Sequence, residues 1–231
     1  MITVNNLTKV YNGTTVLDIK ELQIAKSESY GLVGNNGAGK TTFFRLILDL
    51  IRADSGYVES DNNKVAGNEL WKHYTGSYLD EGFLIEFLTP EEYFNFIGNL
   101  RGMSKGDIAE FLNTYGDFFN DEILGKKKYI RDLSKGNQKK VGIIAALMGS
   151  PSLIILDEPF TNLDPSSQIR LKKIVHEHQA KKDVTMLISS HDLNHITEVC
   201  NRINVLEKGL IVLDLQTNEN TLQQLESYFA V

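Results

Sequence analysis

One glycine-rich stretch constrains the fold of this chain more than any other part of its sequence. It reads Gly34-Asn35-Asn36-Gly37-Ala38-Gly39-Lys40-Thr41-Thr42, which fits the pattern G-x-x-x-x-G-K-[ST]. A short apolar segment, residues 30–33, precedes it, and residues 42–50 after it are predicted to form a helix. The pattern therefore predicts a strand, a phosphate-binding loop and a helix in succession, which is the context that gives this motif a functional meaning.

The residue types in this stretch suit a bound polyphosphate. Its glycines let the backbone take positive φ and approach an anion closely. Successive N–H groups then point inward at a helix N-terminus, whose partial positive charge favours phosphate. Lys40 adds a full charge aimed at the β- and γ-phosphates, and the Thr41 hydroxyl can ligate Mg²⁺. We therefore predict that residues 34–42 bind a nucleoside triphosphate together with Mg²⁺.

The first sixty residues carry strand signals on both sides of the loop. Asn12-Gly13 predicts a hairpin, so the first thirty residues are expected to form two or three short antiparallel strands beside the strand of the phosphate loop. Residues 57–59 return as strand after the first helix, and the sheet is expected to finish there.

The middle third of the chain has the pattern of helices. Thr89 as N-cap, Pro90 at the first helical position and acids in the first turn start a helix that ends before Gly102. A second and a third helix are predicted from about residues 105 and 133. The dense aromatic residues of this region are interpreted as a helical core, with a surface that docks another protein as the alternative.

Two apolar segments of the last third, Leu153–Leu156 and residues 184–188, are too uniformly apolar to have one wet face and are predicted as buried strands. Asp164-Pro165 caps the helix between them, which is predicted to reach about Lys182. The elements predicted after these are a short helix capped by Asp192, a hairpin of residues 202–207 and 210–213, and a closing helix over residues 217–229.

Strands that alternate with helices imply βαβ crossovers and a largely parallel central sheet. We therefore predict an α/β fold, with a P-loop NTPase core, an N-terminal antiparallel β subdomain and a helical subdomain inserted at about residues 83–150. Residues 1–231 are predicted to form a single domain, because no internal repeat, low-complexity stretch or long linker interrupts them.

The composition excludes several classes of protein. With 42% hydrophobic and 23% charged residues, the chain has the make-up of a soluble globular protein, and no apolar run approaches the ~20 residues of a membrane helix. The single cysteine, Cys200, excludes an internal disulfide, and no secretory signal is recognised, so a cytoplasmic location is expected. A net charge of -6 argues against a nucleic-acid partner. The local basic cluster is interpreted as a solvated loop; it comprises Lys126, Lys127, Lys128 and Arg131.

Two acids follow the first of the buried strands. Asp157 and Glu158 come directly after Leu153–Leu156. Because the carboxyl ends of neighbouring parallel strands meet at one edge of a sheet, these acids are expected beside the phosphate loop. Asp157 is then suited to hold Mg²⁺, and Glu158 to orient and polarise an attacking water.

Taken together, these motifs resemble the ATP-binding subunit of an ABC transporter over essentially the whole chain. Leu133-Ser134-Lys135-Gly136-Asn137-Gln138 is similar to the signature sequence of that family, usually LSGGQ. Residues 153–159 then resemble Walker B, Thr161-Asn162-Leu163-Asp164 the D-loop, and His191 the switch histidine. Tyr11 stands where the family has an aromatic residue that stacks on adenine.

The resemblance implies that ATP binds between two subunits packed head to tail. Residues 34–42 of one subunit and Ser134 with Gly136 of the other are expected to contact the same nucleotide. Lys40, Glu158 and His191 are then the catalytic residues, and Asp164 links the two sites. The Mg²⁺ ligands implied are Thr41, Asp157 and Glu81.

The resemblance also implies partners for the chain. These are a second ATPase subunit, most simply a copy of the same chain, and an integral membrane permease that holds the subunit on the inner face of the membrane. The permease is expected to dock near residues 83–102, and nucleic acid is not expected as a partner.

Three motifs depart from the family pattern. The signature has Lys135 and Asn137 where Gly and Gln are usual, a form that resembles exporters of the ABC-2 type. The usual Q-loop glutamine is replaced by an acidic pair, of which Glu81 is the better match and Asp80 the alternative. Asn162 stands in the D-loop where a small residue is usual.

Other readings of these motifs are weaker. A soluble mechanical ATPase of the same family is the alternative function, but the coiled-coil insertion or second ATPase domain usual in that class is absent from the sequence. A GTPase would need an N-K-x-D motif, which Asn63-Lys64-Val65-Ala66 does not complete. His191 and His195 are spaced as in a zinc motif, but Asp192 is predicted to cap a helix that leaves His191 outside. His176 and His178 are expected to be exposed.

Overall fold

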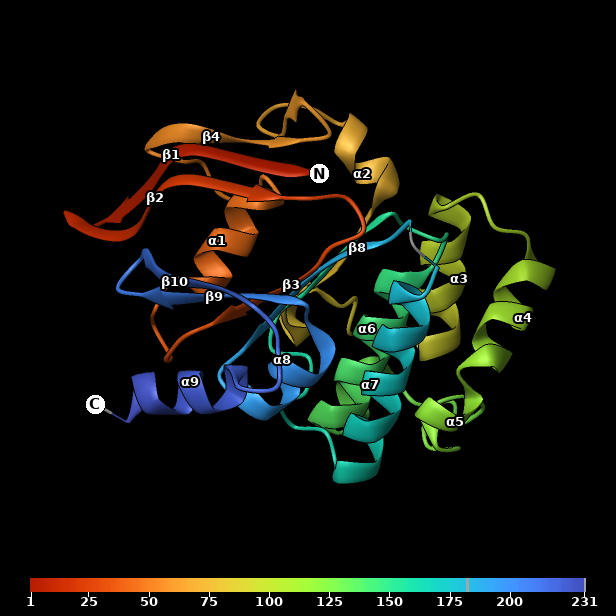
Figure 1. Ribbon diagram of the computed structural model, residues 1–231. Helices are drawn as coiled ribbons and strands as arrows, with labels where there is room; N and C mark the ends of the chain where they lie inside the picture. The colour runs from red at the N-terminus through yellow and green to blue at the C-terminus, as the bar shows by residue number, and fades with distance from the viewer. Residues whose placement is uncertain (182, 231) are drawn as a thin grey trace.

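A computed structural model of the chain describes residues 1–181 and 183–230, which contain two β-sheets (Figure 1). The antiparallel sheet has the order β2-β1-β4-β5, and the central sheet has the order β10-β9-β3-β8-β7-β6. In the central sheet only the edge strand β10 is antiparallel to its neighbour within the described residues. The strands are β1 (Ile2–Tyr11), β2 (Thr14–Ile24), β3 (Ser29–Val33), β4 (Ser55–Ser60), β5 (Asn63–Lys64), β6 (Thr75–Tyr78), β7 (Leu153–Leu156), β8 (Thr185–Ser190), β9 (Arg202–Glu207) and β10 (Leu210–Gln216).

Helix α1 (Lys40–Ile47) lies between the two sheets, and α3 to α9 lie on the other side of the central sheet (Figure 1). The helices other than α1 are α2 (Leu70–Tyr74), η1 (Glu81–Phe83), α3 (Pro90–Leu100), α4 (Lys105–Thr114), α5 (Gly116–Phe119), η2 (Ile130–Asp132), α6 (Lys135–Leu147), α7 (Pro165–Gln179), α8 (Leu193–Val199) and α9 (Thr221–Phe229).

The predicted hairpin is present, but its strands belong to a separate sheet. Asn12 and Gly13 both have positive φ, 50° and 78°, as a two-residue hairpin turn requires. The predicted N-terminal antiparallel subdomain is confirmed, but its strands are not short and do not adjoin β3, because β1 and β2 are 10 and 11 residues long and face the central sheet across α1. A register shift between Lys9 and Val10 interrupts the period-2 pattern, so the sequence signal was weak. Nor does the sheet finish at β4, since β5 follows it.

Two hydrophobic cores, among the residues described, lie on the two faces of the central sheet. Leu153 and Ile155 of β7 pack with α1 and the antiparallel sheet, whereas Ile154 and Leu156 pack with the helices on the other side. Burial on both faces accounts for the uniformly apolar sequence of this strand. The phosphate loop follows β3 at the edge where these strands end.

The helical region between β6 and β7 is built as its capping residues predict. Thr89 caps α3 in a reciprocal capping box with Glu92, and Gly102 just beyond the helix has φ 73°. A second capping box, Ser104 with Asp107, starts α4. Most of the aromatic side chains form the expected core; those buried are Tyr93, Phe94, Tyr115, Phe118 and Phe119.

Several predicted bounds in the last third of the chain shift. β8 covers Thr185–Ser190 rather than residues 184–188, and β10 reaches Gln216 rather than residue 213. Helix α7 ends at Gln179, and the predicted end, Lys182, lies outside the described residues. The closing helix begins at Thr221 rather than 217, because the Thr217 N–H donates to the Asn201 carbonyl as β10 ends at Gln216. The turn of the last hairpin has positive φ at Lys208 and Gly209, as its sequence predicts.

His178 corrects one prediction. Its side chain is buried, with the residue 6% exposed, whereas the sequence analysis expected it on the surface. The helix that carries it is covered by the inserted helices, and the Tyr115 hydroxyl lies 2.9 Å from His178 Nε2. Burial lowers the pKa of His178 to about 4, because the charged imidazole would lose its hydration.

This buried imidazole predicts acid sensitivity. Between pH 7.5 and 5.5 the unfolded chain takes up a proton at His178, whose ordinary pKa is 6.5, while the folded chain does not. The contribution of His178 to the free energy of unfolding is therefore present above pH 6.5 and is lost as the pH falls. Between pH 7.5 and 5.5 this loss is about 1.4 kcal/mol. Urea unfolding at pH 7.5 and 5.5 measures the loss in the free energy of unfolding. This loss should be smaller by about 1.4 kcal/mol in His178→Gln than in the wild type. Equal losses in the variant and the wild type would contradict the prediction.

Candidate functional site

The phosphate loop takes a shape that only glycine allows at key positions. Gly37 and Gly39 have φ 84° and 111°, in the left-handed region. A Cβ on Gly34 would lie 2.3 Å from the Leu206 carbonyl oxygen, and one on Gly39 would lie 2.8 Å from that of Val16. Helix α1 begins at Lys40, two residues earlier than predicted, so its N-terminus faces the loop directly. The loop therefore has the geometry of an anion site at a helix start.

Lys40 stands at the centre of this loop. The residue is 6% exposed, and its Nζ donates to the Gly34 carbonyl oxygen at 2.6 Å. The same Nζ lies 3.2 Å from Glu158 Oε1. A cavity of about 230 Å³ opens over these groups, lined by Val16, residues 36–42 and Glu158. The cavity thus presents one fixed ammonium group and several backbone amides to an anion.

Asp157 lies next to Thr41, as predicted. β7 and β8 are adjacent parallel strands, and both end at the edge occupied by the loop. Asp157 Oδ2 accepts a hydrogen bond of 2.5 Å from Thr41 Oγ1, and its Oδ1 accepts one from Ser189 Oγ. Burial raises the pKa of Asp157, and the hydrogen bonds from Ser189 and Thr41 oppose that rise.

This pair of oxygens fits Mg²⁺. The ion prefers oxygen ligands and is bound in phosphate sites by one or two protein groups together with the phosphates. A buried carboxylate with a raised pKa gains most from a nearby cation, and Asp157 is only 3% exposed. Thr41 and Asp157 are therefore the two side chains whose positions suit the ion.

Glu158 and His191 form a pair above Lys40. His191 Nδ1 lies 2.9 Å from Glu158 Oε2, and the His191 backbone N–H donates to the same oxygen at 3.3 Å. Glu158 has a positive φ of 47°, which is uncommon outside glycine, and its N–H donates to Ser189 Oγ at 2.9 Å. His191 lies outside α8, whose N-cap is Asp192, as predicted. Glu158 therefore has one oxygen near Lys40 and the other near His191.

The signature residues lie away from this cavity. Ser134 is the N-cap of α6 and accepts a hydrogen bond from the Asn137 N–H at 3.2 Å. A Cβ on Gly136 would lie 2.6 Å from the Asn162 carbonyl oxygen, so a glycine is required for α6 to approach the D-loop this closely. Asp164 caps α7, and hydrogen bonds from Ser166 and Ser167 lower its pKa.

The residues predicted to contact adenine or to complete the Mg²⁺ site contact other protein groups in this structure. Tyr11, at the end of β1, is exposed, with Lys9 Nζ 5.2 Å from its ring centre. Glu81 Oε1 accepts a hydrogen bond of 2.8 Å from the Tyr78 hydroxyl, and Asp80 lies 3.6 Å from Arg45. Their roles in binding adenine or Mg²⁺ stay predictions.

Two polar residues at the site escaped the sequence analysis. Ser189 bonds both Asp157 and Glu158, and the signal for it was its position at the end of the buried strand β8. Lys139 lies on α6 and donates to the Glu158 carbonyl oxygen at 2.8 Å. Its signal was a lysine on the buried side of an apolar helix.

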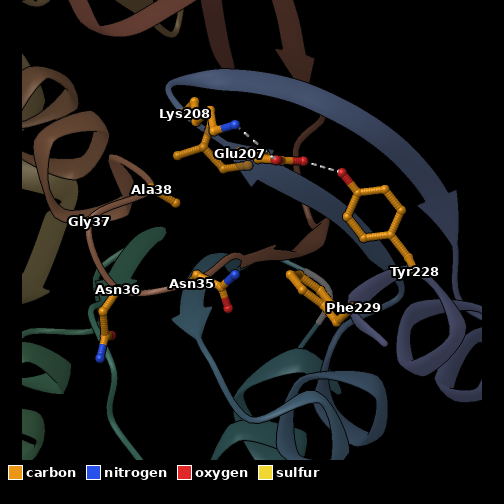
Figure 2. Close-up of a pocket in the computed structure, with 9 residues that line it drawn as sticks. Asn35, Asn36, Gly37, Ala38, Glu207, Lys208, Tyr228 and Phe229 are labelled. Carbon is orange, nitrogen blue, oxygen red and sulfur yellow. Dashed lines mark hydrogen bonds and ion pairs between the residues drawn. The ribbon is translucent and has the colours of Figure 1, made fainter. Parts of the chain in front are cut away.

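The outer face of the loop borders a second cavity of about 610 Å³. Figure 2 shows Asn35 of the loop and Phe229 of α9 beside it, with the Tyr228 hydroxyl donating to Glu207. The Gly209 N–H donates to the Ala38 carbonyl oxygen at 3.0 Å, so the β9–β10 turn supports the loop from this side.

The chain is similar to known proteins over most of its length. The family model described as ABC transporter matches residues 17–161. The chain is 36% identical over 226 residues to the bacitracin transport ATP-binding protein BcrA of Enterococcus faecalis, covering 95% of this chain and 70% of that protein. It is 34% identical over 219 residues to the ABC transporter ATP-binding protein YhaQ of Bacillus subtilis, covering 95% and 72%.

A solved structure has the same fold. It is the dimeric post-hydrolysis state of the ATP-binding cassette MJ0796 bound to ADP and Pi, with a TM-score of 0.84 and 22% identity. The match covers 94% of this chain and 99% of that chain. The likeness concerns the fold and confirms the predicted fold class.

Proposed function

We propose that residues at the ends of β7 and β8 and in the phosphate loop bind and hydrolyse ATP, since the chain belongs to the ABC transporter family. It is an ATP-hydrolysing subunit that powers transport. The observation that carries the proposal is the convergence of three side chains at the ends of β7 and β8 and at the loop. Lys40 Nζ lies 3.2 Å from Glu158 Oε1, whose other oxygen lies 2.9 Å from His191 Nδ1. An ammonium and a carboxylate thus line one cavity, and an imidazole contacts that carboxylate.

In this proposal the loop residues 34–42 hold the phosphates. Lys40 turns from the Gly34 carbonyl toward the β- and γ-phosphates, and its charge offsets theirs. Thr41 and Asp157 would hold Mg²⁺, which supplies further positive charge to the phosphates when bound. Tyr11 and Glu81 are proposed as additional contacts to adenine and to Mg²⁺.

Glu158 orients the attacking water by accepting its hydrogen bond. The water oxygen forms a bond to the γ-phosphorus while the bond from that phosphorus to the leaving oxygen of ADP breaks, giving ADP and phosphate. His191 holds Glu158 in place and contacts the γ-phosphate from the same subunit. As the new bond forms, the attacking water loses a proton, which the Glu158 carboxylate accepts and then releases to solvent.

We propose that the site is completed by a second copy of the chain. Ser134 and Gly136 stand at the N-terminus of α6, outside the cavity that Lys40 and Glu158 line. A helix N-terminus that faces solvent is suited to a phosphate group presented by another molecule. A head-to-tail dimer brings it to the γ-phosphate, so ATP favours the closed dimer and hydrolysis releases it.

The membrane partner is proposed to dock on an apolar patch that precedes α3. No helix in the described part of the chain has the length and apolar character to cross a bilayer. The docking patch comprises Phe83, Ile85 and Phe87, which are exposed, Phe87 by 62%. Arg131 lies 5.1 Å from the centre of the Phe87 ring. Exposed apolar groups of this kind mark interaction surfaces, and a permease loop on the cytoplasmic side is the proposed occupant.

A substitution in the docking patch tests whether a permease binds there. The tagged chain should bring down a protein with several membrane spans from detergent-solubilised membranes, and Phe87→Glu should reduce its recovery about tenfold, because a charge replaces a buried apolar contact. Ile169→Glu, at a residue on α7 that is 68% exposed, is the matched control and should leave recovery unchanged. Basal ATP hydrolysis should be the same in all three proteins. Recovery unaffected by Phe87→Glu would place the permease elsewhere, and no membrane protein at all would favour a non-transport ATPase.

A further inference from the structure

Lys139 is a buried lysine whose bonding the proposed ATPase site does not use. It lies in the second turn of α6, and the residue is 5% exposed. Its Nζ donates to the Glu158 carbonyl oxygen at 2.8 Å and to Thr161 Oγ1 at 2.7 Å. The same Nζ lies 5.7 Å from the centre of the Tyr78 ring. An ammonium group is taken out of water only at a high cost, so its contacts with these partners need an explanation.

Charges of the nucleotide site surround this ammonium group. Burial lowers the pKa of Lys139, and nearby carboxylates oppose that shift by favouring the charged form. These carboxylates belong to Glu81, Glu158, Asp157 and Asp80. The lysine therefore neutralises part of the negative charge behind the site without entering the cavity of the phosphate loop.

The contact is made to a backbone that needs support. Glu158 has φ 47°, a backbone conformation that residues other than glycine rarely adopt. Its N–H donates to Ser189 Oγ, and its carbonyl oxygen accepts from both Lys139 Nζ and Thr161 Oγ1. A strained backbone persists where the surroundings hold it from several sides. Here the peptide groups on both sides of the Glu158 Cα are fixed.

We propose that Lys139 is a positioning residue, which holds the Glu158 backbone so that its carboxylate stays between Lys40 and His191. This inference rests on the proposed role of Glu158 in hydrolysis. Because Lys139 contacts the Glu158 backbone and the Thr161 hydroxyl rather than the phosphate loop, it acts on the chemical step rather than on nucleotide binding.

The test is ATP hydrolysis by Lys139→Met, which keeps the length of the side chain and removes its charge and donors. We expect kcat to fall by about ten- to a hundredfold, since misplacing a catalytic group by about 1 Å has an effect of this size. KM and the affinity for ATP should stay within about twofold of the wild type. Lys139→Gln, whose amide can still donate to the carbonyl, should recover at least a third of the wild-type kcat.

Controls separate positioning from folding and from the proposed site itself. Lys172→Met removes a lysine of α7 that pairs with Glu198 and should keep the wild-type kcat. If Lys139→Met fails to fold, Thr161→Val decides, because it removes the hydroxyl that donates to the Glu158 carbonyl and accepts from Lys139 Nζ, and it should lower kcat several-fold. A wild-type kcat in the deciding variant, or a Lys139→Gln as impaired as Lys139→Met, overturns the inference. Wild-type hydrolysis by Glu158→Gln would overturn the proposed site instead.

Discussion

Glu158→Gln is expected to lower kcat for ATP hydrolysis by at least about a hundredfold and to leave ATP binding intact. The amide has the shape of the carboxylate but cannot polarise the attacking water. Its position is otherwise maintained, because the backbone of Glu158 is held by Ser189 and Lys139. ATP that is bound and not hydrolysed should keep two subunits closed, so the variant should elute as a dimer at millimolar ATP with Mg²⁺.

The measurement is steady-state phosphate release together with size-exclusion chromatography. Glu177→Gln, an exposed position on α7, is the matched control and should behave as the wild type. A variant that hydrolyses ATP normally would remove Glu158 from the mechanism. One that is inactive but stays monomeric with ATP would leave Glu158 in place and contradict the closed dimer of the isolated chain.

Lys40→Ala is expected to weaken ATP binding by about a hundredfold or more, the size of effect expected when charge-assisted hydrogen bonds to phosphate are lost. In the folded chain the Lys40 Nζ is held by the Gly34 carbonyl and by Glu158, so it is already near the position of the phosphates. Fluorescent-nucleotide titration measures the affinity. Lys173→Ala, at an exposed lysine of α7, should not change it. Unchanged affinity in Lys40→Ala would mean that the nucleotide binds elsewhere.

The parts of the site that the sequence predicts are those made by consecutive residues. The phosphate loop, its flanking strand and helix, and the acids after β7 follow from local patterns. Asp157 then reaches Thr41 because parallel strands end at one edge, a rule that needs only the strand order. The capping residues Thr89 and Asp164 likewise predicted the first residue of α3 and of α7 correctly, because a cap is a local pattern.

What the sequence does not predict depends on packing between distant segments. The antiparallel subdomain was predicted, but no local signal states that its sheet lies across α1 from the central sheet or that β5 extends it beyond β4. His178 has a polar sequence environment, yet it is buried and contacts Tyr115, which lies between α4 and α5 and is 63 residues away in the sequence. Lys139 and Ser189 matter through contacts to Glu158 made across elements, and a single sequence carries no record of such contacts.

The two hydrophobic cores have a consequence for local unfolding. They share only the central sheet, so amide hydrogens on the two sides can exchange through separate openings of different free energy. The phosphate loop extends from the core around α1, whereas α6 and α7 belong to the core on the other side. In the proposed dimer, a nucleotide held by the phosphate loop of one subunit and by α6 of its partner joins one core of each subunit and raises the cost of opening either one. Each round of hydrolysis is then also a cycle in the rigidity of the subunit.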